Sequence, residues 1–325
     1  MNRALSLTLG LLTFVASSHS ASAQTPPWPT KPIRFVVPFA PGGIADLAAR
    51  IVGAKLTESL GQQVVVENKP GGNATIGMSA VAKAAPDGYT FVVATEGDFT
   101  LATLVLKDIP YDITRDFELI TTLTDTPTGL ASHVGSPYKA FADVVAAAKA
   151  NPGKIPASSP GNGGIQQLHM EWMSLGAGIK LQHIPYKGGA PAGAAVAAGD
   201  VPLGLLAVTS ALPHIKAGRV QMLAQTAARR SRFMPDVPTM RELGIADIDG
   251  TNWTGLAAPK RTPQPILDKL HAEVIRILAL PDVIERLQAS SAVVLPSTPA
   301  AFAASIAREI VAIRPIVEKS GMTAE

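Results

Sequence analysis

The stretch "IRFVVPFAPGGIADLAAR", residues 33–50, decides the fold. Five β-forming residues, Ile33–Val37, lead through a turn with two adjacent glycines into a helix predicted over 44–60. The first N–H groups of a helix lack internal partners and carry a partial positive charge, and glycine lets a ligand approach them closely. The stretch therefore predicts a strand–turn–helix unit whose turn can hold a carboxylate or a phosphate.

The same alternation continues along the chain in two series. Strands are predicted at 33–37, 63–68, 89–95, 117–123, 154–159, 179–186, 201–208 and 219–226. Helices are predicted at 44–60, 74–84, 140–150, 165–175, 191–198, 211–217, 263–278, 281–289 and 299–318. Short apolar strands that alternate with helices indicate βαβ units and a mostly parallel sheet. We expect one lobe from 24–130 and 253–325, another from 131–252, and chain crossings near 128–134 and 249–254.

Four of the predicted turns have glycine just before a helix. They lie at 38–46, 67–77, 158–167 and 185–193. Turns that follow parallel strands lie at one edge of an open α/β sheet, where ligands bind. A single turn of this kind is equally consistent with a tight turn and nothing more. Because four such turns occur in two lobes, we predict that at least two of them contact a ligand. We interpret the turn at 67–77 as structural.

Composition excludes several classes of protein. The 325 residues carry a formal net charge of +3 and contain no long run of Lys or Arg, so nucleic acid is not an expected partner. The short basic run "ARRSR", 228–232, is interpreted as the solvated end of a helix. The chain has no cysteine, which excludes disulfides, thiolate nucleophiles and Cys-ligated metals.

The N-terminal segment has the pattern of a secretory signal. Arg3 is followed by an apolar stretch over 5–15 and by the small residues Ala21–Ala23. The apolar stretch is shorter than the roughly 20 residues that a membrane-spanning helix needs. We therefore expect cleavage after Ala23 and a periplasmic protein that begins at Gln24.

The motifs of nucleotide binding and of hydrolysis are missing. The chain has no GxxxxGK[ST], no HExxH and no GxSxG, and "GNGGIQ" at 161–166 does not complete GxGxxG. An alternative is a serine hydrolase built on Ser136 and Lys139 of "SPYK", although this short motif arises often by chance and Pro137 follows the serine. We predict no catalytic residue, no metal ligand and no cofactor.

Three further polar residues are interpreted as structural. His169 and Glu171 have the spacing of the HxE motif of zinc deaminases, but their Cys ligands are absent, so His169 is interpreted as structural. Asp46 and Asp98 stand in predicted first turns of helices, where capping explains them without chemistry.

Ten motifs in order resemble one family. They include "WPTKPIRFVVPFAPGGIADLAAR", "VENKPGGNATIG", "AAPDGYT", "AKANPGKI", "GNGGIQQLHMEW", "IPYKGGAPA", "PDVPTMRELG" and "LAAPKRTPQPILDKL". Together they resemble the Bug-type extracytoplasmic receptors of tripartite tricarboxylate transporters, over essentially the whole mature chain. The resemblance implies a periplasmic-binding-protein-like (Venus-flytrap) α/β fold, in which two lobes joined by a hinge close on a small ligand.

The resemblance also implies function. Ligands of the family are small carboxylates: dicarboxylates, amino acids and aromatic acids. The partner is a permease with large and small transmembrane subunits, or alternatively a sensor protein, and the receptor is expected to be a monomer. By motif, the ligand-binding residues are Phe39, Pro41, Gly42, Gly43, Ile44, Asp46, Thr95, Glu96, Gly97, Ser158, Ser159, Gly161, Asn162, Gly163, Tyr186, Lys187, Gly188, Thr209 and Ser210.

Two departures from the family pattern bear on the ligand. Glu96 stands where a small uncharged residue is common, and a carboxylate there repels an anionic ligand. One hypothesis is that the ligand offers Glu96 an amine or another hydrogen-bond donor. The alternative is that Glu96 points outward or pairs with a cation of the protein. Ala195 and Pro202 replace two aspartates of the family pattern, which puts any role of those acids in doubt.

Overall fold

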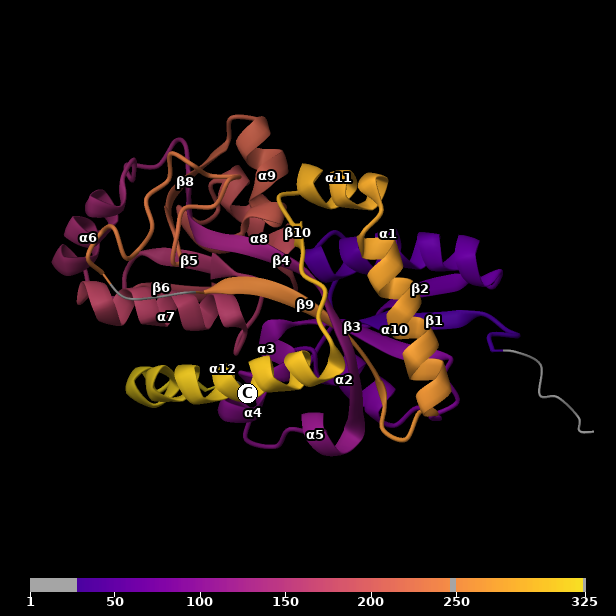
Figure 1. Cartoon of the computed structure of the whole chain (residues 1–325). Helices are drawn as coiled ribbons and strands as arrows, with labels where there is room; N and C mark the ends of the chain where they lie inside the picture. The colour runs from indigo at the N-terminus through magenta and orange to yellow at the C-terminus, as the bar shows by residue number, and fades with distance from the viewer. Residues whose placement is uncertain (1–27, 246–249, 324–325) are drawn as a thin grey trace, which may run out of the picture.

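One continuous series of hydrogen-bonded strands extends through two α/β lobes, and strands β4 and β9 cross from one lobe to the other (Figure 1). The computed structural model describes residues 28–245 and 250–323. The strand order is β2-β1-β3-β9-β4-β7-β5-β6, with β8 and β10 also paired to β4. Strand β4 (Phe117–His133) pairs with β9 (Thr251–Pro259) along its first part and with β7 and β8 along its second. The two lobes are therefore joined by a shared strand.

The first lobe opens with the predicted strand–turn–helix units. Its elements are β1 (Ile33–Val37), α1 (Ile44–Leu60), β2 (Val64–Asn68), α2 (Thr75–Ala82), β3 (Thr90–Thr95), α3 (Glu96–Phe99), α4 (Ala102–Val105) and α5 (Ile113–Asp116). Helix α1 has the predicted bounds and ends at Gly61, whose left-handed conformation (φ 68°) suits glycine. The single-turn helices α4 and α5 were not predicted, and α3 was anticipated only through the placement of Asp98 in the first turn of a helix.

The second lobe repeats the alternation of strand and helix. Its elements are α6 (Phe141–Ala150), β5 (Pro156–Ser159), α7 (Ile165–Ala177), β6 (Gln182–Pro185), α8 (Gly189–Ala198), β7 (Leu203–Ala207), α9 (Val208–Lys216) and β8 (Val220–Gln225). After β9, the chain returns to the first lobe through α10 (Gln264–Leu278), α11 (Pro281–Ala289), β10 (Val293–Val294) and α12 (Pro299–Ser320). Helices α10, α11 and α12 all carry proline in the first turn, where its missing N–H costs nothing.

The sheet is mixed rather than mostly parallel. Strands β1, β2 and β3 are parallel to one another, as are β5, β6 and β7. Strand β9 is antiparallel to both β3 and β4, and β4 is antiparallel to β7 and β8. The antiparallel pairs arise because the crossing strands enter each lobe from the other one.

Each lobe has its own apolar core, and a third apolar cluster joins them. Phe35, Phe91 and Leu270 are fully buried between the first sheet and helices α1 and α10. Leu205 and Met173 lie in the core of the second lobe. The joining cluster packs α4 against α7 and α12, through Leu101, Val105, Ile165, Leu168, Ile313, Ile316 and Val317. Helix α12 therefore contacts both lobes, although its residues were assigned to the first.

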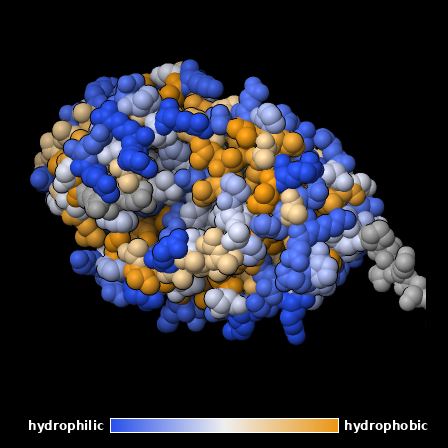
Figure 2. All heavy atoms as spheres, in the orientation of Figure 1, coloured by the Kyte–Doolittle hydropathy of each residue, from blue (hydrophilic) through white to orange (hydrophobic). Residues whose placement is uncertain are grey.

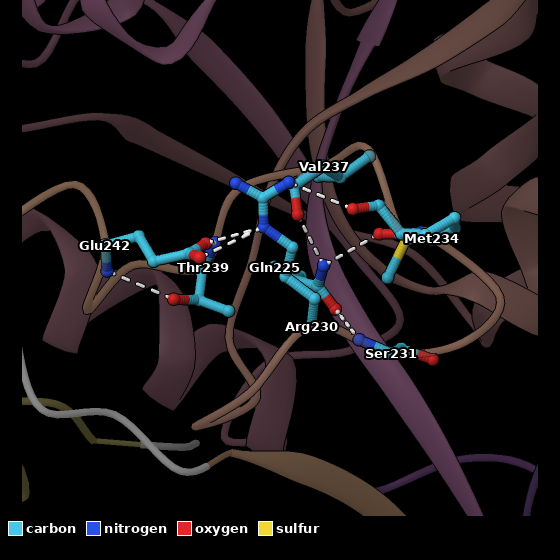
Figure 3. A network of polar contacts seen from close by, with 8 residues as sticks. Gln225, Arg230, Ser231, Met234, Val237, Thr239 and Glu242 are labelled. Atoms are coloured by element: carbon cyan, nitrogen blue, oxygen red, sulfur yellow. Dashed lines mark hydrogen bonds and ion pairs between the residues drawn. The ribbon is translucent and has the colours of Figure 1, made fainter.

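The basic run at 228–232 lies in a loop, so its interpretation as a helix end was wrong. Figure 3 shows how Gln225 and Arg230 order this loop. The fully buried Gln225 amide donates to the carbonyls of Met234 (3.0 Å) and Val237 (2.6 Å), and its oxygen accepts from Ser231 N (2.8 Å). Arg230 Nε donates to both carboxylate oxygens of Glu242. These contacts substitute for helical hydrogen bonds, so the run needs no helix to be ordered.

The surface separates by polarity on the face drawn in Figure 2. Hydrophilic residues cover the two ends of the molecule, and hydrophobic residues gather mainly over the middle of this face. Within 28–245 and 250–323, no helix combines the length and the hydrophobicity that a bilayer crossing requires. The predicted signal segment, 1–23, lies outside the described residues.

Candidate functional site

Two adjoining cavities lie between the lobes. The larger has a volume of about 310 Å³ and is lined by Pro38, Phe39, Pro70–Ala74, Thr95, Gly97, Asp98, Ala102 and Leu106 from the first lobe, and by Pro160–Gln166 and Pro185–Gly188 from the second. The smaller, of about 40 Å³, is lined by Phe39, Gly43–Asp46, Thr95, Pro160, Gln166, Gly189, Ala207, Ser210 and Asn252. Because Phe39, Thr95, Pro160 and Gln166 line both cavities, the two form one site with a large and a small compartment.

Helix α1 brings its N-terminus to the smaller cavity. Gly43, which precedes the helix, has extended backbone, and no side chain caps the first-turn N–H groups. Asp46 instead reaches back to accept from Gly42 N (3.0 Å), and it also accepts from Arg50 Nε and Asn68 Nδ2. Burial opposes ionisation of Asp46, but these donors outweigh it and hold its pKa below the usual value. Asp46 therefore fixes the loop and leaves the helix end open.

Helices α7 and α8 bring two more uncapped N-termini to the site. No side chain caps α7 at Gly164 or α8 at Gly188. Gly188 has a positive φ of 124°, a conformation that favours glycine. With α1, three helix N-termini from both lobes border the two cavities without a side-chain cap from the described residues, an arrangement that attracts an anion.

Polar side chains complete the smaller cavity. Gln166, Ser210 and Asn252 are buried yet line it, and Asn252 Oδ1 has no hydrogen-bond partner in the described part of the chain. Amide and hydroxyl groups can donate hydrogen bonds to a carboxylate. Lys187, which is exposed at the rim of the larger cavity, is the only Lys or Arg among the described residues that line either one.

The lobes touch across the site. A Cβ added at Gly42 would lie 3.5 Å from Ala190 Cβ, and one added at Gly188 would lie 3.7 Å from Ala40 Cβ. A Cβ added at Gly97 would lie 3.1 Å from the backbone nitrogen of Ile165. Glycines therefore permit the close approach of the two lobes on both sides of the cavities.

The structure brings most of the residues chosen from the sequence to the cavities. Those that line them are Phe39, Gly43, Ile44, Asp46, Thr95, Gly97, Gly161, Asn162, Gly163, Tyr186, Lys187, Gly188 and Ser210. Those that line neither are Pro41, Gly42, Glu96, Ser158, Ser159 and Thr209.

Ser158 and Ser159 support the second lobe from behind the cavities. Ser158 Oγ donates to the carbonyl of Ala192 in α8 (3.2 Å). Ser159 Oγ bonds His183 Nε2 (2.6 Å) and donates to the carbonyl of Gly161 (2.8 Å), and burial lowers the pKa of His183 to about 4. Both serines thus hold the glycine-rich loop and helix in place.

Glu96 points into the first lobe, which neither hypothesis for it anticipated. The side chain is buried, and its Oε2 has no hydrogen-bond partner among the described residues. Burial, then the nearby carboxylates of Glu309 and Asp125, raise the pKa of Glu96 well above its usual value, while the backbone N–H of Trp253 opposes this. The carboxyl thus faces other acids of the protein rather than the cavities.

The residues of the hydrolase alternative lie apart from both cavities. Lys139 Nζ donates to the carbonyl of Val134, and Ser136 Oγ accepts from Tyr138 N (3.3 Å). His169 is buried against Thr128 (3.3 Å), and burial lowers its pKa to about 4. Within 28–245 and 250–323, no group of three or more His, Asp or Glu side chains is arranged to hold a metal ion.

Sequence reasoning missed several lining residues. The turn at 70–74, interpreted as structural, lines the larger cavity. Ala102 and Leu106 belong to the unpredicted α4 and the residue that follows it. Gln166 follows a glycine-rich turn and could have been chosen by the same rule as its neighbours. Asn252 stands near a predicted crossing, but nothing in the local pattern singles it out.

The profile of the family described as "Tripartite tricarboxylate transporter family receptor" matches residues 48–322. The chain belongs to this family. It is 32% identical to Protein BugT of Bordetella pertussis over 312 residues, and the matched region covers 95% of each chain. The resemblance to Bug-type receptors is thereby confirmed.

Two solved structures with ligands are similar to this tripartite tricarboxylate transporter receptor. Rpa4515 of R. palustris with adipate is 29% identical, with a TM-score of 0.88 over 91% of this chain and 99% of the other. MatC of Rhodopseudomonas palustris with bound malate is 30% identical, with a TM-score of 0.85 over 89% of this chain and 100% of the other. The periplasmic-binding-protein-like α/β fold is therefore confirmed for this receptor.

Proposed function

We propose that this receptor closes on a small carboxylate-bearing molecule in the periplasm and delivers it, without chemistry, to a permease with large and small transmembrane subunits. One observation carries the proposal: three uncapped helix N-termini, from both lobes, meet at one site between them. A ligand that contacts both lobes favours the closed state, since only that state offers all its contacts. The adipate and malate of the two similar structures agree with an anionic ligand.

A thermal-shift screen tests the proposal. Dicarboxylates, amino acids, aromatic acids and neutral analogues of each are added to the mature protein, and the melting temperature is recorded. A ligand that binds only the folded state adds about 2.7 kcal/mol of stability at 100 times its Kd, so a cognate carboxylate should raise the melting temperature by several degrees. Amides and esters of the same compounds are the matched controls. A screen in which no carboxylate exceeds its amide would contradict the proposal.

Closure of the lobes depends on Gly97. In a Gly97→Leu variant, we expect binding of the best carboxylate from the screen to weaken by about tenfold, because the side chain would meet the backbone of Ile165 on the other lobe and would enter the larger cavity. Small-angle scattering with and without ligand should show compaction of the wild-type protein and a smaller change in the variant. An unchanged affinity together with normal compaction would show that this contact does not belong to closure.

Export is testable at the N-terminus. Expressed with its native leader in a Gram-negative host, the protein recovered from the periplasm should begin at Gln24. A Leu11→Arg variant interrupts the apolar segment and should remain in the cell as the longer precursor. Equal periplasmic recovery of both proteins, or a periplasmic protein that still begins at Met1, would refute the assignment of the leader.

A further inference from the structure

Asp98 presents one carboxylate oxygen to the larger cavity. Its Oδ2 accepts hydrogen bonds from Thr95 N (2.8 Å) and Thr95 Oγ1 (2.9 Å), in the capping box that Asp98 forms with the N-cap residue Thr95 of α3. Its Oδ1 accepts no hydrogen bond from the described residues, and this atom is not completely buried. Asp98 is only 6% exposed and lines the cavity, so its free oxygen opens into that space.

Among the residues that the structure describes, no Lys or Arg forms an ion pair with this carboxylate. Burial raises the pKa of Asp98 to about 7, although the hydrogen bonds from Thr95 oppose the shift. The hydroxyl of Tyr111 donates to the backbone carbonyl of Asp98 (3.3 Å), and Glu96 on the same helix turns towards Glu309. Across the cavity, Lys187 is exposed on the other lobe. A buried carboxylate without a neighbouring cation is costly, and a cation on the ligand would lower that cost.

The larger and the smaller cavity together set the distance between the charged groups of a ligand that occupies both. Thr95 lines both cavities, and Asp98 is bonded to both its backbone nitrogen and its hydroxyl. A group at Asp98 is therefore close to a carboxylate held in the smaller cavity. Apolar side chains form much of the rest of the larger cavity, namely Phe39, Ala74, Ala102, Leu106 and Ile165. Its other polar side chains are those of Asn73, Asn162, Gln166, Tyr186 and Lys187.

We propose that Asp98 is a specificity residue that receives an ammonium group of the ligand. The ligand is then an amino acid with an apolar side chain, whose carboxylate lies against the helix ends and whose side chain fills the larger cavity. This inference rests on the proposed receptor function and narrows its ligand class. The ligand donor that one of the two sequence hypotheses placed at Glu96 is thereby assigned to Asp98, two residues further along.

Matched pairs of ligands test the proposal by titration calorimetry. The mature protein is titrated with L-leucine and 4-methylpentanoate, and with L-phenylalanine and 3-phenylpropanoate, which differ chiefly in the amine. At least one amino acid should bind about tenfold more tightly than its partner, the gain that a hydrogen bond to a charged group provides. In Asp98→Asn this advantage should disappear, while binding of the partner stays within about twofold.

Asp143 in the second lobe provides a matched control for Asp98→Asn. Asp143 Oδ2 accepts from Lys139 N and Ala140 N at the start of α6, as Asp98 does from Thr95, but Asp143 lines neither cavity. Asp143→Asn should therefore leave both members of each pair unchanged. An equal loss for both members in Asp98→Asn would show that Asp98 only shapes the site, and would overturn the proposal.

The pH dependence separates an ammonium from a second carboxylate. An ammonium needs Asp98 ionised, so affinity for the amino acid should rise about tenfold from pH 6 to pH 8 if the carboxyl of the free receptor titrates near 7. The rise should be absent in Asp98→Asn. A dicarboxylate such as malate that binds more tightly than every amino acid, with affinity falling over that range, would overturn the inference and leave the receptor function intact. No response to any amino acid or carboxylate would overturn both.

Discussion

Replacing Gly43 by valine should weaken carboxylate binding by at least about 100-fold while the protein still folds. Gly43 borders the smaller cavity at the start of α1, and a Cβ added there meets nothing within 4 Å. Its extended backbone (φ −83°, ψ 174°) suits valine. The new side chain would occupy the cavity of about 40 Å³ and remove the hydrogen bonds of the ligand to the helix end, each worth about 1.5–3 kcal/mol to a charged group. Calorimetric titration of the best ligand measures the loss.

Two further variants serve as comparisons for Gly43→Val. Ala54→Val adds a branched side chain of the same type on the exposed side of α1 and should bind normally. Gly43→Ala should give an intermediate loss, since it fills less of the cavity. If folded Gly43→Val keeps the wild-type affinity, the carboxylate does not lie against α1, and the larger cavity must hold it alone.

The strand–turn–helix units were predictable because their signals are local. At 33–60 the β-branched run, the paired glycines and the apolar periodicity all lie within one unit, and the bounds of α1 follow from them. The long strand β4 was not predictable in full. Pro127 and Gly129 interrupt its second half, and its extended form there depends on pairing with β7, β8 and β9, which are distant in sequence.

The candidate site was predictable only where backbone groups, rather than side chains, form it. Glycines at helix starts mark the loops around Gly43, Gly163 and Gly188, and all three line the cavities. Side chains were harder, because neighbouring residues on a single-turn helix point in different directions. Glu96 and Asp98 are two residues apart on α3, yet one faces the lobe interior and the other lines the cavity.

Three acids meet inside the first lobe, and their effect on the free energy of unfolding can be measured. Glu96, Asp125 on β4 and Glu309 on α12 surround Trp253 of β9, whose indole Nε1 donates to Glu309 Oε1 (2.7 Å). Burial, together with the nearby Asp125, raises the pKa of Glu309 to about 7 against the hydrogen bond from Trp253. At neutral pH the protein therefore holds carboxyl groups whose charged forms are disfavoured by burial and by one another.

Glu96→Gln should stabilise the protein at pH 8 by about 1–3 kcal/mol, the range for an unsatisfied buried polar group, and leave its stability at pH 4 nearly unchanged. Because the folded state raises the pKa of Glu96, protonation stabilises the fold fully at low pH, and this contribution is lost as the pH rises through the folded pKa. Glutamine keeps the shape of the neutral acid and removes the penalty of the buried charge. Urea unfolding at both pH values measures the difference, with Glu285→Gln on the exposed side of α11 as control. Equal effects of Glu96→Gln at both pH values would mean that its carboxyl is not neutralised by burial. A gain at pH 8 would instead show that the acids inside the first lobe are retained at a cost to stability.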